Sequence, residues 1–347
     1  MSNFVFKELS AGGQFDPLAL NPSAPFTQAQ FYGQWQEALG RKVRRLVVSR
    51  GSEVVAYLQV IKYPLIRDWH YLYAPYGPVM KNYEPELLEA LAEYLCSLCE
   101  VEKAVFVRLD FTPAPEAETR KNLGKYFSPA SLATYHSAYF QPRTEWFLDL
   151  NKTSDEMLRD LDKKTRYSIK QAEKAGVVTE IVDHDFNKYF PDFYRLMSET
   201  AKRNGFQLHA KSYYENIFAR LENNKNAFLV VAKYQEQILV INLIIIFGEI
   251  ANYVFSGASS EHRELSASYL AQWRSITESA KRGAKHYNFG GVSGDDKMYH
   301  GWQGLTLFKK KFGGYLVEHA PFYDLVAKPF WYWLYNLRKL LLSYGSK

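Results

Sequence analysis

A repeated order of apolar runs, turns and amphipathic stretches is the main pattern along the chain. In its first copy, LVVSRGSEVVAYLQVIKY indicates two strands joined by a turn at Gly51-Ser52, and residues 69–73 indicate a third strand. An amphipathic stretch over residues 85–99 predicts a helix. The apolar run over residues 104–110 predicts the strand that follows it.

The second copy repeats this order in the second half of the chain. FLVVAKYQEQILVINLIIIF again indicates strand, turn and strand, and residues 250–255 indicate the third strand. A helix over residues 266–283 and a strand over residues 286–289 follow. Such a duplication predicts two similarly folded α/β domains. Gly77 and Gly257 come after the third strands, where mixed sheets commonly bind ligands.

Helices are predicted between and after the two copies. Thr153 or Ser154 caps a helical stretch that continues through KKTRYSIKQAEKAGV to Gly176. Further helices are expected over residues 186–203 and around Tyr213-Tyr214. The last helix, in KPFWYWLYNLRKLLLSYGSK, could lie on a membrane surface or pack back on the body, and packing is favoured.

Size and charge limit the interpretation without deciding it. A chain of 347 residues suggests two domains, and 47% hydrophobic residues suffice for a substantial core. The 43 basic and 37 acidic residues leave a net charge of +6. This excess is compatible with phosphate-bearing ligands or RNA but does not require them.

Several classes of protein receive no support from the sequence. Cys96 and Cys99 form a C-x-x-C within the helix over residues 85–99, without a second pair for zinc, and are expected to be helix cysteines in a reducing compartment. No dinucleotide, P-loop, zinc-protease or serine-hydrolase motif occurs, so neither a metal nor a cofactor is expected. No signal peptide and no spanning segment is visible, which favours a cytosolic protein.

The stretch from Asn288 to Gly314, NFGGVSGDDKMYHGWQGLTLFKKKFGG, carries the most chemistry. A strand ends at Gly290-Gly291, a polar loop follows, and a short helical segment then carries the lysines. The loop contains Gly294, Asp295 and Asp296. A lysine fixed beside such a loop can stabilise negative charge that develops during a reaction. The residues alone are equally compatible with a hairpin-like loop and a solvated basic helix end.

Several motifs together resemble the Fem family of non-ribosomal peptidyltransferases, which build peptidoglycan cross-bridges from aminoacyl-tRNA. They are FGGVSG…GLTLFKKKFGGYLVE, RYSIKQAEKAGV, APYGPV at residues 74–79, and YVFSGASSEHR followed by YLAQW. The resemblance covers nearly the whole chain. It implies an α/β fold with two GNAT-like domains, mixed sheets flanked by helices, and a C-terminal segment that returns to domain one. Only a short link at residues 222–226 stands where some members carry a long helical arm, so the compact FemX type is the nearest match.

The resemblance also implies domain roles and partners. Residues 1–147 with 319–347 would form the domain that binds the peptidoglycan precursor, and residues 148–318 the domain on the aminoacyl-tRNA side with the catalytic lysine. The acceptor would be UDP-MurNAc-pentapeptide or lipid II, used by a monomer at the inner face of the plasma membrane. The chemistry is attack by a stem-peptide amine on an activated ester.

Site residues follow from matching this sequence to the family's motifs. Catalytic roles fall on Lys309 as the group that stabilises the oxyanion, on its neighbour Phe308, and on Asp110, for which a structural role is an equal explanation. The substrate-binding positions are Gln34, Tyr76, Gln207, His209, Tyr213 and Tyr253. The positions expected to contact tRNA are Lys163, Arg166, Lys170, Lys310 and Lys311. Gln34 and His209 replace an expected lysine and arginine, which leaves room for a lipid-linked acceptor.

Two other functions remain open from the sequence. A CoA-dependent N-acyltransferase would need R/Q-x-x-G-x-G/A before a helix, and this chain has Arg263-Glu-Leu-Ser266-Ala-Ser268 there. Serine at both glycine positions would crowd that loop. A non-catalytic RNA- or membrane-binding protein on the same fold is the other alternative, based on the basic helix and the aromatic terminal helix.

Overall fold

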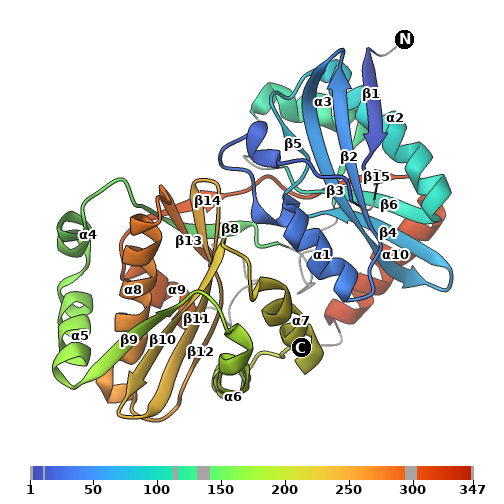
Figure 1. The fold of residues 1–347 in the computed structure, drawn as a ribbon. Coiled ribbons are helices and arrows are strands. Elements are labelled where there is room, and N and C mark those ends of the chain that lie inside the picture. The colour runs from blue at the N-terminus through green and yellow to red at the C-terminus, as the bar shows by residue number, and fades with distance from the viewer. Residues whose placement is uncertain (1–2, 11, 112–115, 131–140, 294–302, 345–347) are drawn as a thin grey trace. The chain divides into compact units, whose positions relative to one another are not determined.

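A computed structural model describes residues 3–10, 12–111, 116–130, 141–293 and 303–344 of the chain. The chain divides into two compact units. Unit 1 comprises Met1–Arg143 together with Glu318–Lys347, and unit 2 comprises Thr144–Val317. Figure 1 shows that each unit is built on its own sheet with helices against it.

Unit 1 is a mixed sheet in the order β1-β2-β3-β4-β6-β15-β7, with β5 paired to β3. Only β4 and β6 are parallel among its described strand pairs, because α2 connects them as a crossover. Its strands are β1 (Phe4–Glu8), β2 (Val43–Arg50), β3 (Glu53–Ile66), β4 (Trp69–Ala74), β5 (Val79–Met80), β6 (Ala104–Leu109), β7 (Ser128–Pro129) and β15 (Tyr323–Val326). Its helices are α1 (Gln30–Ala38), α2 (Pro85–Glu102), α3 (Ala117–Tyr126) and α10 (Pro329–Tyr344).

Strand β6 shows how both faces of this sheet are buried. All six of its residues are inaccessible to solvent. Val107 and Leu109 join the cluster formed with α2, whereas the alternate residue Phe106 contacts Tyr335 of α10. Arg108 lies on the α10 side and forms a fully buried ion pair with Asp324 of β15. The C-terminal strand is therefore an internal part of unit 1.

Unit 2 has a sheet in the order β14-β8-β13-β12-β11-β10-β9, in which the described pairing of β12 with β13 is parallel. Helices α5 and α8 lie against one face, and α6 and α7 lie against the other (Figure 1). Its strands are β8 (Thr144–Asp149), β9 (Val177–Val182), β10 (Ala227–Tyr234), β11 (Gln237–Phe247), β12 (Ile250–Ala258), β13 (His286–Gly291) and β14 (Tyr315–Glu318). Its helices are α4 (Ser154–Asp160), α5 (Lys163–Lys174), α6 (Phe186–Asn204), α7 (Lys211–Leu221), α8 (Ala267–Lys281) and α9 (Gln303–Lys310).

Most local predictions agree with these elements. Thr153 caps α4 in a capping box with Glu156, and the duplicated strand order is present. Cys96 and Cys99 are free thiols on α2, and burial raises the pKa of Cys99 to about 12. Only residues 222–226 separate α7 from β10, so the chain has no long arm there.

The expectation that Gly257 lies after the end of the third strand is wrong. Strand β12 continues through Gly257 to Ala258. A Cβ atom at Gly257 would lie 2.7 Å from both Leu196 Cβ and Met197 N of α6. The glycine therefore lets α6 approach the sheet closely, which is a packing role.

Replacing Gly257 with alanine is expected to lower the free energy of unfolding by about 1–3 kcal/mol, because one contact is with backbone that cannot move aside. Urea denaturation measures this loss. Gly283→Ala is not a matched comparison since its φ is +89°, but Gly304→Ala in α9 has open space around the new methyl group and is expected to be neutral or stabilising. A Gly257→Ala protein as stable as the wild type would contradict the packing role.

Candidate functional site

Lys309 is a buried lysine on the inner side of the short helix α9. It shares that side with Thr306, and with Phe312 just beyond the helix end, and only 4% of its surface is exposed. Its Nζ donates a hydrogen bond of 2.5 Å to the carbonyl oxygen of Gly291, at the end of β13. A flexible and strongly hydrated ammonium group is rarely buried, so this position is a candidate for chemistry.

The environment of Lys309 makes its charge sensitive to pH. Burial lowers the pKa of Lys309 from 10.5 to about 7, and the nearby carboxylate of Glu145 opposes this shift. Glu145 is itself buried and pairs with Gly291 across β8 and β13. The amine is therefore poised between its neutral and charged forms near neutral pH.

The backbone around the lysine is shaped by polar contacts. Gly290 has a φ of +75°, and its N–H donates to Asn288 Oδ1 at 2.7 Å, so the strand turns sharply beside the amine. Ser293 N donates to Thr306 Oγ1 at 2.8 Å, which ties the strand end to α9. The predicted loop residues Gly294, Asp295 and Asp296 lie outside the described residues.

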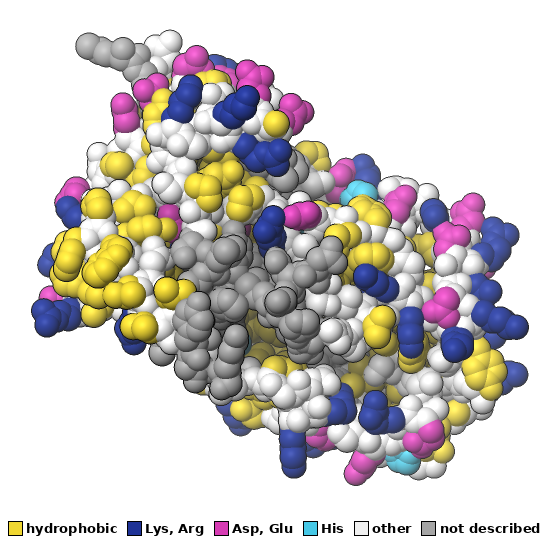
Figure 2. All heavy atoms as spheres, turned by 180° about the vertical axis from the view of Figure 1, so that it is seen from behind, with side chains coloured by type: hydrophobic (Ala, Val, Ile, Leu, Met, Phe, Trp, Pro, Cys, Tyr) yellow, Lys and Arg dark blue, Asp and Glu magenta, His cyan; other side chains and the backbone are white. Residues whose placement is uncertain are grey.

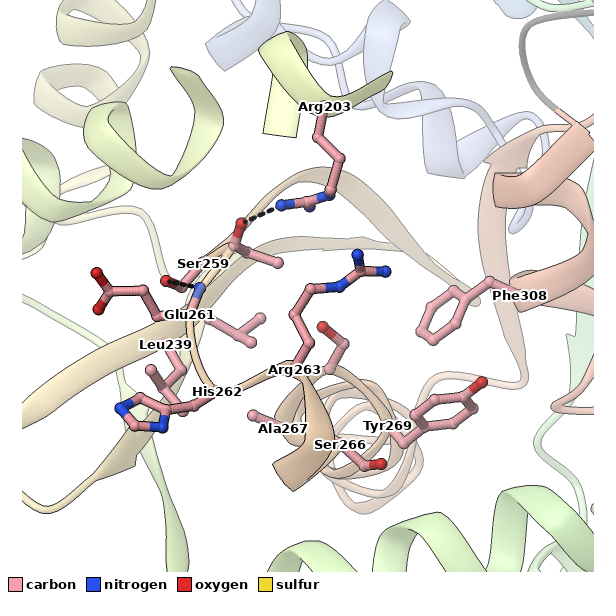
Figure 3. Close-up of a pocket in the computed structure, with 13 residues that line it drawn as sticks. Arg203, Leu239, Ser259, Glu261, His262, Arg263, Ser266, Ala267, Tyr269 and Phe308 are labelled. Carbon is pink, nitrogen blue, oxygen red and sulfur yellow. Dashed lines mark hydrogen bonds between the residues drawn. The ribbon is translucent and has the colours of Figure 1, made fainter. Parts of the chain in front are cut away.

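A pocket next to α9 contains two arginines, and we call it the arginine pocket (Figure 3). Its lining comes from α6, β11, the end of β12 with the turn that follows, the first turn of α8, and α9: Arg203, Leu239, Val240, Ala258, Ser259, Glu261, His262, Arg263, Ser266, Ala267, Ser268, Tyr269 and Phe308. Arg203 and Arg263 both point into it, whereas the Glu261 carboxylate points away and accepts from Gln237 (Figure 3). Phe308 packs edge-on against Tyr269 at 5.2 Å between ring centroids. Lys309 follows Phe308 in the chain, but its amine turns to the carbonyl oxygen of Gly291, and its side chain is not among those that line the pocket.

The charges of the arginine pocket favour an anion. Burial and the nearby Arg263 lower the pKa of Arg203, although Glu199 acts in the opposite direction. Arg203 donates to Ala258 O and Ser260 Oγ, which holds it in place. The N-terminus of α8 also lines the pocket, and no described side chain caps it. A bound phosphate would relieve the repulsion between the arginines and use the free N–H groups.

Asp110 is a buried carboxylate in unit 1. It accepts a 2.5 Å hydrogen bond from Tyr73 Oη and a 3.2 Å bond from Tyr76 N, and burial raises its pKa to about 6. The predicted Tyr76 is also buried, with a φ of +51°, and its hydroxyl donates to Pro142 O. Asp110 thus holds the turn that carries Tyr76. Gln34 is exposed on α1 of the same unit.

The remaining predicted substrate-binding residues belong to unit 2. The rings of His209 and Tyr213 are in tilted contact, with centroids 4.2 Å apart, at the α6–α7 connection, where Gln207 is exposed. Tyr253 lies on β12, and burial raises its pKa to about 12. Its carbonyl oxygen would lie 3.8 Å from a Cβ atom at Gly290, so it borders the turn beside Lys309.

The basic residues predicted to contact tRNA have different environments. Lys163, Lys170 and Lys310 are exposed. Arg166 donates to the carbonyl oxygens of Arg159 and Leu161, so it closes the end of α4. Lys311 donates to Tyr269 Oη at 2.8 Å. No set of three or more His, Cys, Asp or Glu side chains within the described ranges could hold a metal ion.

Arg203 was not predicted as a site residue, and Arg263 was considered only for CoA binding. Arg203 lies at the end of a helix that is far from Arg263 in the sequence, and exposed basic residues are common in the last helical turn. The one available signal was Arg263 in the turn before α8, where an anion-binding loop is expected in this type of fold.

Comparison with known proteins places the chain in a family. The model of the FemAB family matches residues 18–237 and 222–339. Lipid II:glycine glycyltransferase of Staphylococcus aureus (strain MRSA252) is 24% identical over 382 residues, which cover 88% of this chain and 89% of that protein.

Two solved structures share the fold. The crystal structure of FemX has a TM-score of 0.81 at 21% identity and covers 95% of this chain and 100% of its own. A tandem GNAT protein from the clavulanic acid biosynthesis pathway has a TM-score of 0.50 at 11% identity, covering 93% and 98%. The fold is therefore a pair of GNAT-like units, as predicted. Since the family model spans most of the sequence, the chain belongs to the FemAB family.

Proposed function

We propose that this protein is an aminoacyltransferase that moves an amino acid from aminoacyl-tRNA to a stem-peptide amine of a lipid-linked peptidoglycan precursor. The observation that carries the proposal is the buried amine of Lys309 beside the strand end at Gly291, in the same unit as a pocket suited to phosphate. The similarity to lipid II:glycine glycyltransferase supports the same type of reaction.

The reaction needs positioning and charge stabilisation more than a covalent intermediate. A neutral amine attacks the ester carbonyl, and the tetrahedral intermediate carries an oxyanion. The ester C–O bond then breaks, and the proton lost by the amine nitrogen ends on the tRNA oxygen, which leaves as a hydroxyl. Lys309 in its charged form stabilises that oxyanion from a buried position, where a charge acts strongly. A nearby anionic donor raises the charged fraction of an amine whose pKa is about 7.

The arginine pocket would hold a phosphate at the 3′ end of the tRNA donor. Arg203 and Arg263 supply fixed cations, and the first turn of α8 supplies backbone N–H groups. Phe308, the residue before Lys309, contributes to the pocket lining. The proposal requires the donor ester to extend from this pocket to the amine of Lys309.

Changing Arg263 to alanine is expected to raise KM for the charged tRNA about tenfold with little change in kcat, since one phosphate contact is lost. Steady-state transfer with varied tRNA measures this effect. The slope of log KM against log salt concentration should also fall by about one, because one fewer counterion is released on binding.

Arg274→Ala is the matched control, because Arg274 is an exposed arginine on the same helix, α8, away from the pocket lining. If Arg263→Ala and Arg274→Ala had the same KM for the charged tRNA, the arginine pocket would have no role in donor binding.

The acceptor is proposed to be lipid-linked. The resemblance leads one to expect cations at positions 34 and 209 for a soluble nucleotide-linked acceptor, and this chain has Gln34 and His209 there. No helix in the described part of the chain has the length and apolar character needed to cross a bilayer. Purified protein offered a panel of charged tRNAs with lipid II or UDP-MurNAc-pentapeptide, with product mass as the readout, tests donor and acceptor together. Absence of any transferred residue across the panel would refute the proposal.

The CoA-dependent alternative is disfavoured by the turn before α8. Ser266 adopts a φ of +57° at one of the positions where a CoA-binding loop carries glycine, and Ser268 occupies the other. The two linked phosphates of a CoA pyrophosphate must lie along consecutive backbone N–H groups, and the serine side chains leave less room for this than for the single phosphate proposed above. Micromolar binding of acetyl-CoA in calorimetry would reverse this preference.

A further inference from the structure

The outward face of α10 is apolar, which is the reverse of an ordinary surface helix. Phe330 is 66% exposed, Trp333 59% and Leu341 64%, and Leu340 is exposed as well. Positions 330, 333, 337, 340 and 341 recur at helical spacing, so they form one stripe along the helix. We call these residues the α10 stripe. Figure 2 shows hydrophobic side chains gathered on the face of unit 1 where α10 lies.

The opposite face of α10 holds the helix firmly on unit 1. Tyr335 packs against Phe106 of β6 with ring centroids 5.1 Å apart, and Tyr332 donates a 2.7 Å hydrogen bond to the buried Asp324. Trp331 packs against Trp69 of β4 at 5.8 Å. The stripe is therefore displayed by an anchored helix, and its exposure does not result from a detached chain end.

The charges on α10 select the kind of surface it can meet. The helix contains Arg338 and Lys339 and no acidic residue. Arg338 is exposed and lies beside Leu341 on the helix surface, whereas Lys339 is half-buried with its Nζ 5.9 Å from the centre of the Tyr335 ring. An aromatic and leucine stripe with a cation at its edge matches the boundary between acyl chains and anionic headgroups.

We propose that the α10 stripe docks this protein on the surface of a bilayer that contains anionic phospholipids. The proposal rests on the proposed function, because a lipid-linked acceptor is presented at such a surface. Phe330, Trp333 and Leu341 enter the headgroup region, and Arg338 pairs with lipid phosphate. Pairing with a second copy through the same stripe is less favourable, since α10 offers no acidic group to meet the partner's Arg338.

Co-sedimentation of the full chain with vesicles tests the proposal without any tRNA or acceptor. We expect binding to vesicles of phosphatidylethanolamine with phosphatidylglycerol and much weaker binding to phosphatidylcholine alone. Phe330→Ser/Trp333→Ser should lower the partition constant at least about tenfold. Arg338→Gln should lower it about threefold, and only at low salt.

Val101→Ser is the matched control, because Val101 is 71% exposed on α2 of the same unit and outside the stripe. It should bind vesicles like the wild type. Thermal melting verifies that each variant is folded, which is expected because the changed side chains are mostly exposed. Wild-type protein that stays in the supernatant, or a double serine variant that binds as well as Val101→Ser, overturns the proposal.

Two further readouts separate this inference from the proposed function. With lipid II embedded in vesicles, the double serine variant should lose transfer, whereas with a short-chain, water-soluble analogue it should match the wild type. Vesicle binding without any transfer would refute the proposed function alone. Sedimentation equilibrium showing a dimer that the double serine variant abolishes would assign the stripe to self-association instead.

Discussion

Replacement of Lys309 by methionine is expected to lower the rate of amino-acid transfer by about 100- to 1000-fold, the usual effect of removing one group that stabilises an oxyanion. Methionine fills a similar volume but carries no charge. The same change is expected to stabilise the protein, because the cost of burying an amine with a depressed pKa disappears. Single-turnover transfer measures the first effect, and thermal or urea unfolding the second.

The stability effect has a defined dependence on pH. The pKa of Lys309 is about 7 in the folded protein, against 10.5 as its ordinary value. Between these values the unfolded chain binds a proton that the folded chain has lost, so the wild-type free energy of unfolding rises with pH by up to about 1.4 kcal/mol per unit from this group. Lys309→Met lacks this slope. The gain in free energy of unfolding of Lys309→Met over the wild type should be largest at pH 7 and below, and should decrease toward pH 10.5.

Lys281→Met is the appropriate control for both measurements. Lys281 lies on α8 of the same unit with 80% of its side chain exposed, so the identical chemical change there should leave activity and stability nearly unchanged. Transfer by Lys309→Met within threefold of the Lys281→Met rate would remove Lys309 from the reaction. A destabilised Lys309→Met protein would show that the hydrogen bond to Gly291 outweighs the cost of burial.

Replacement of Asp324 by alanine is expected to lower the free energy of unfolding of unit 1 by about 3–5 kcal/mol. Arg108 and Asp324 are both fully buried, with Nη2 and Oδ2 2.5 Å apart, and Tyr332 donates to the same carboxylate. Removing the carboxylate leaves a buried guanidinium without its counter-charge. Urea denaturation followed by tryptophan fluorescence would show the loss.

A double variant distinguishes charge from packing. In Arg108→Met/Asp324→Leu both charges are replaced by apolar groups, and stability should return to within about 1–2 kcal/mol of the wild type. Equal losses in Asp324→Ala and in the double variant would indicate that shape and not charge governs this site. A loss below 1 kcal/mol for Asp324→Ala would mean that the cavity hydrates and the pair is weakly coupled.

The sequence predicts correctly those helices and strands that are determined by residues close together in the chain. The strands of both copies, the Thr153 cap and the helix that bears both cysteines follow from periodicity and capping chemistry, and the structure confirms them. Gly257 shows the limit of such reasoning. Whether a glycine admits a ligand or a helix depends on what packs across the sheet, and Leu196 of α6 is distant in the sequence.

In the candidate site, too, the residue types are visible in the sequence, whereas their burial depends on elements that are distant in the chain. Lys309, Lys310 and Lys311 form one basic run, and only helical spacing together with the packing of α9 buries the first while leaving the others exposed. The family resemblance singled out Lys309, but the depression of its pKa follows from burial that no sequence pattern shows. Arg203 and Arg263 come together only because α6 packs against the sheet that leads into α8.

The position of β15 between β6 and β7 has a consequence for the order in which the protein is made. Unit 2 is continuous in the sequence, whereas the sheet of unit 1 needs a strand that the ribosome delivers after all of unit 2. When all of unit 2 has been synthesised, β6 still lacks its neighbouring strand β15. Arg108 still lacks its ion-pair partner Asp324. The sheet of unit 1 is therefore completed only after all of unit 2 has been synthesised, and a chain truncated before residue 323 would contain the whole of unit 2 and an incomplete unit 1.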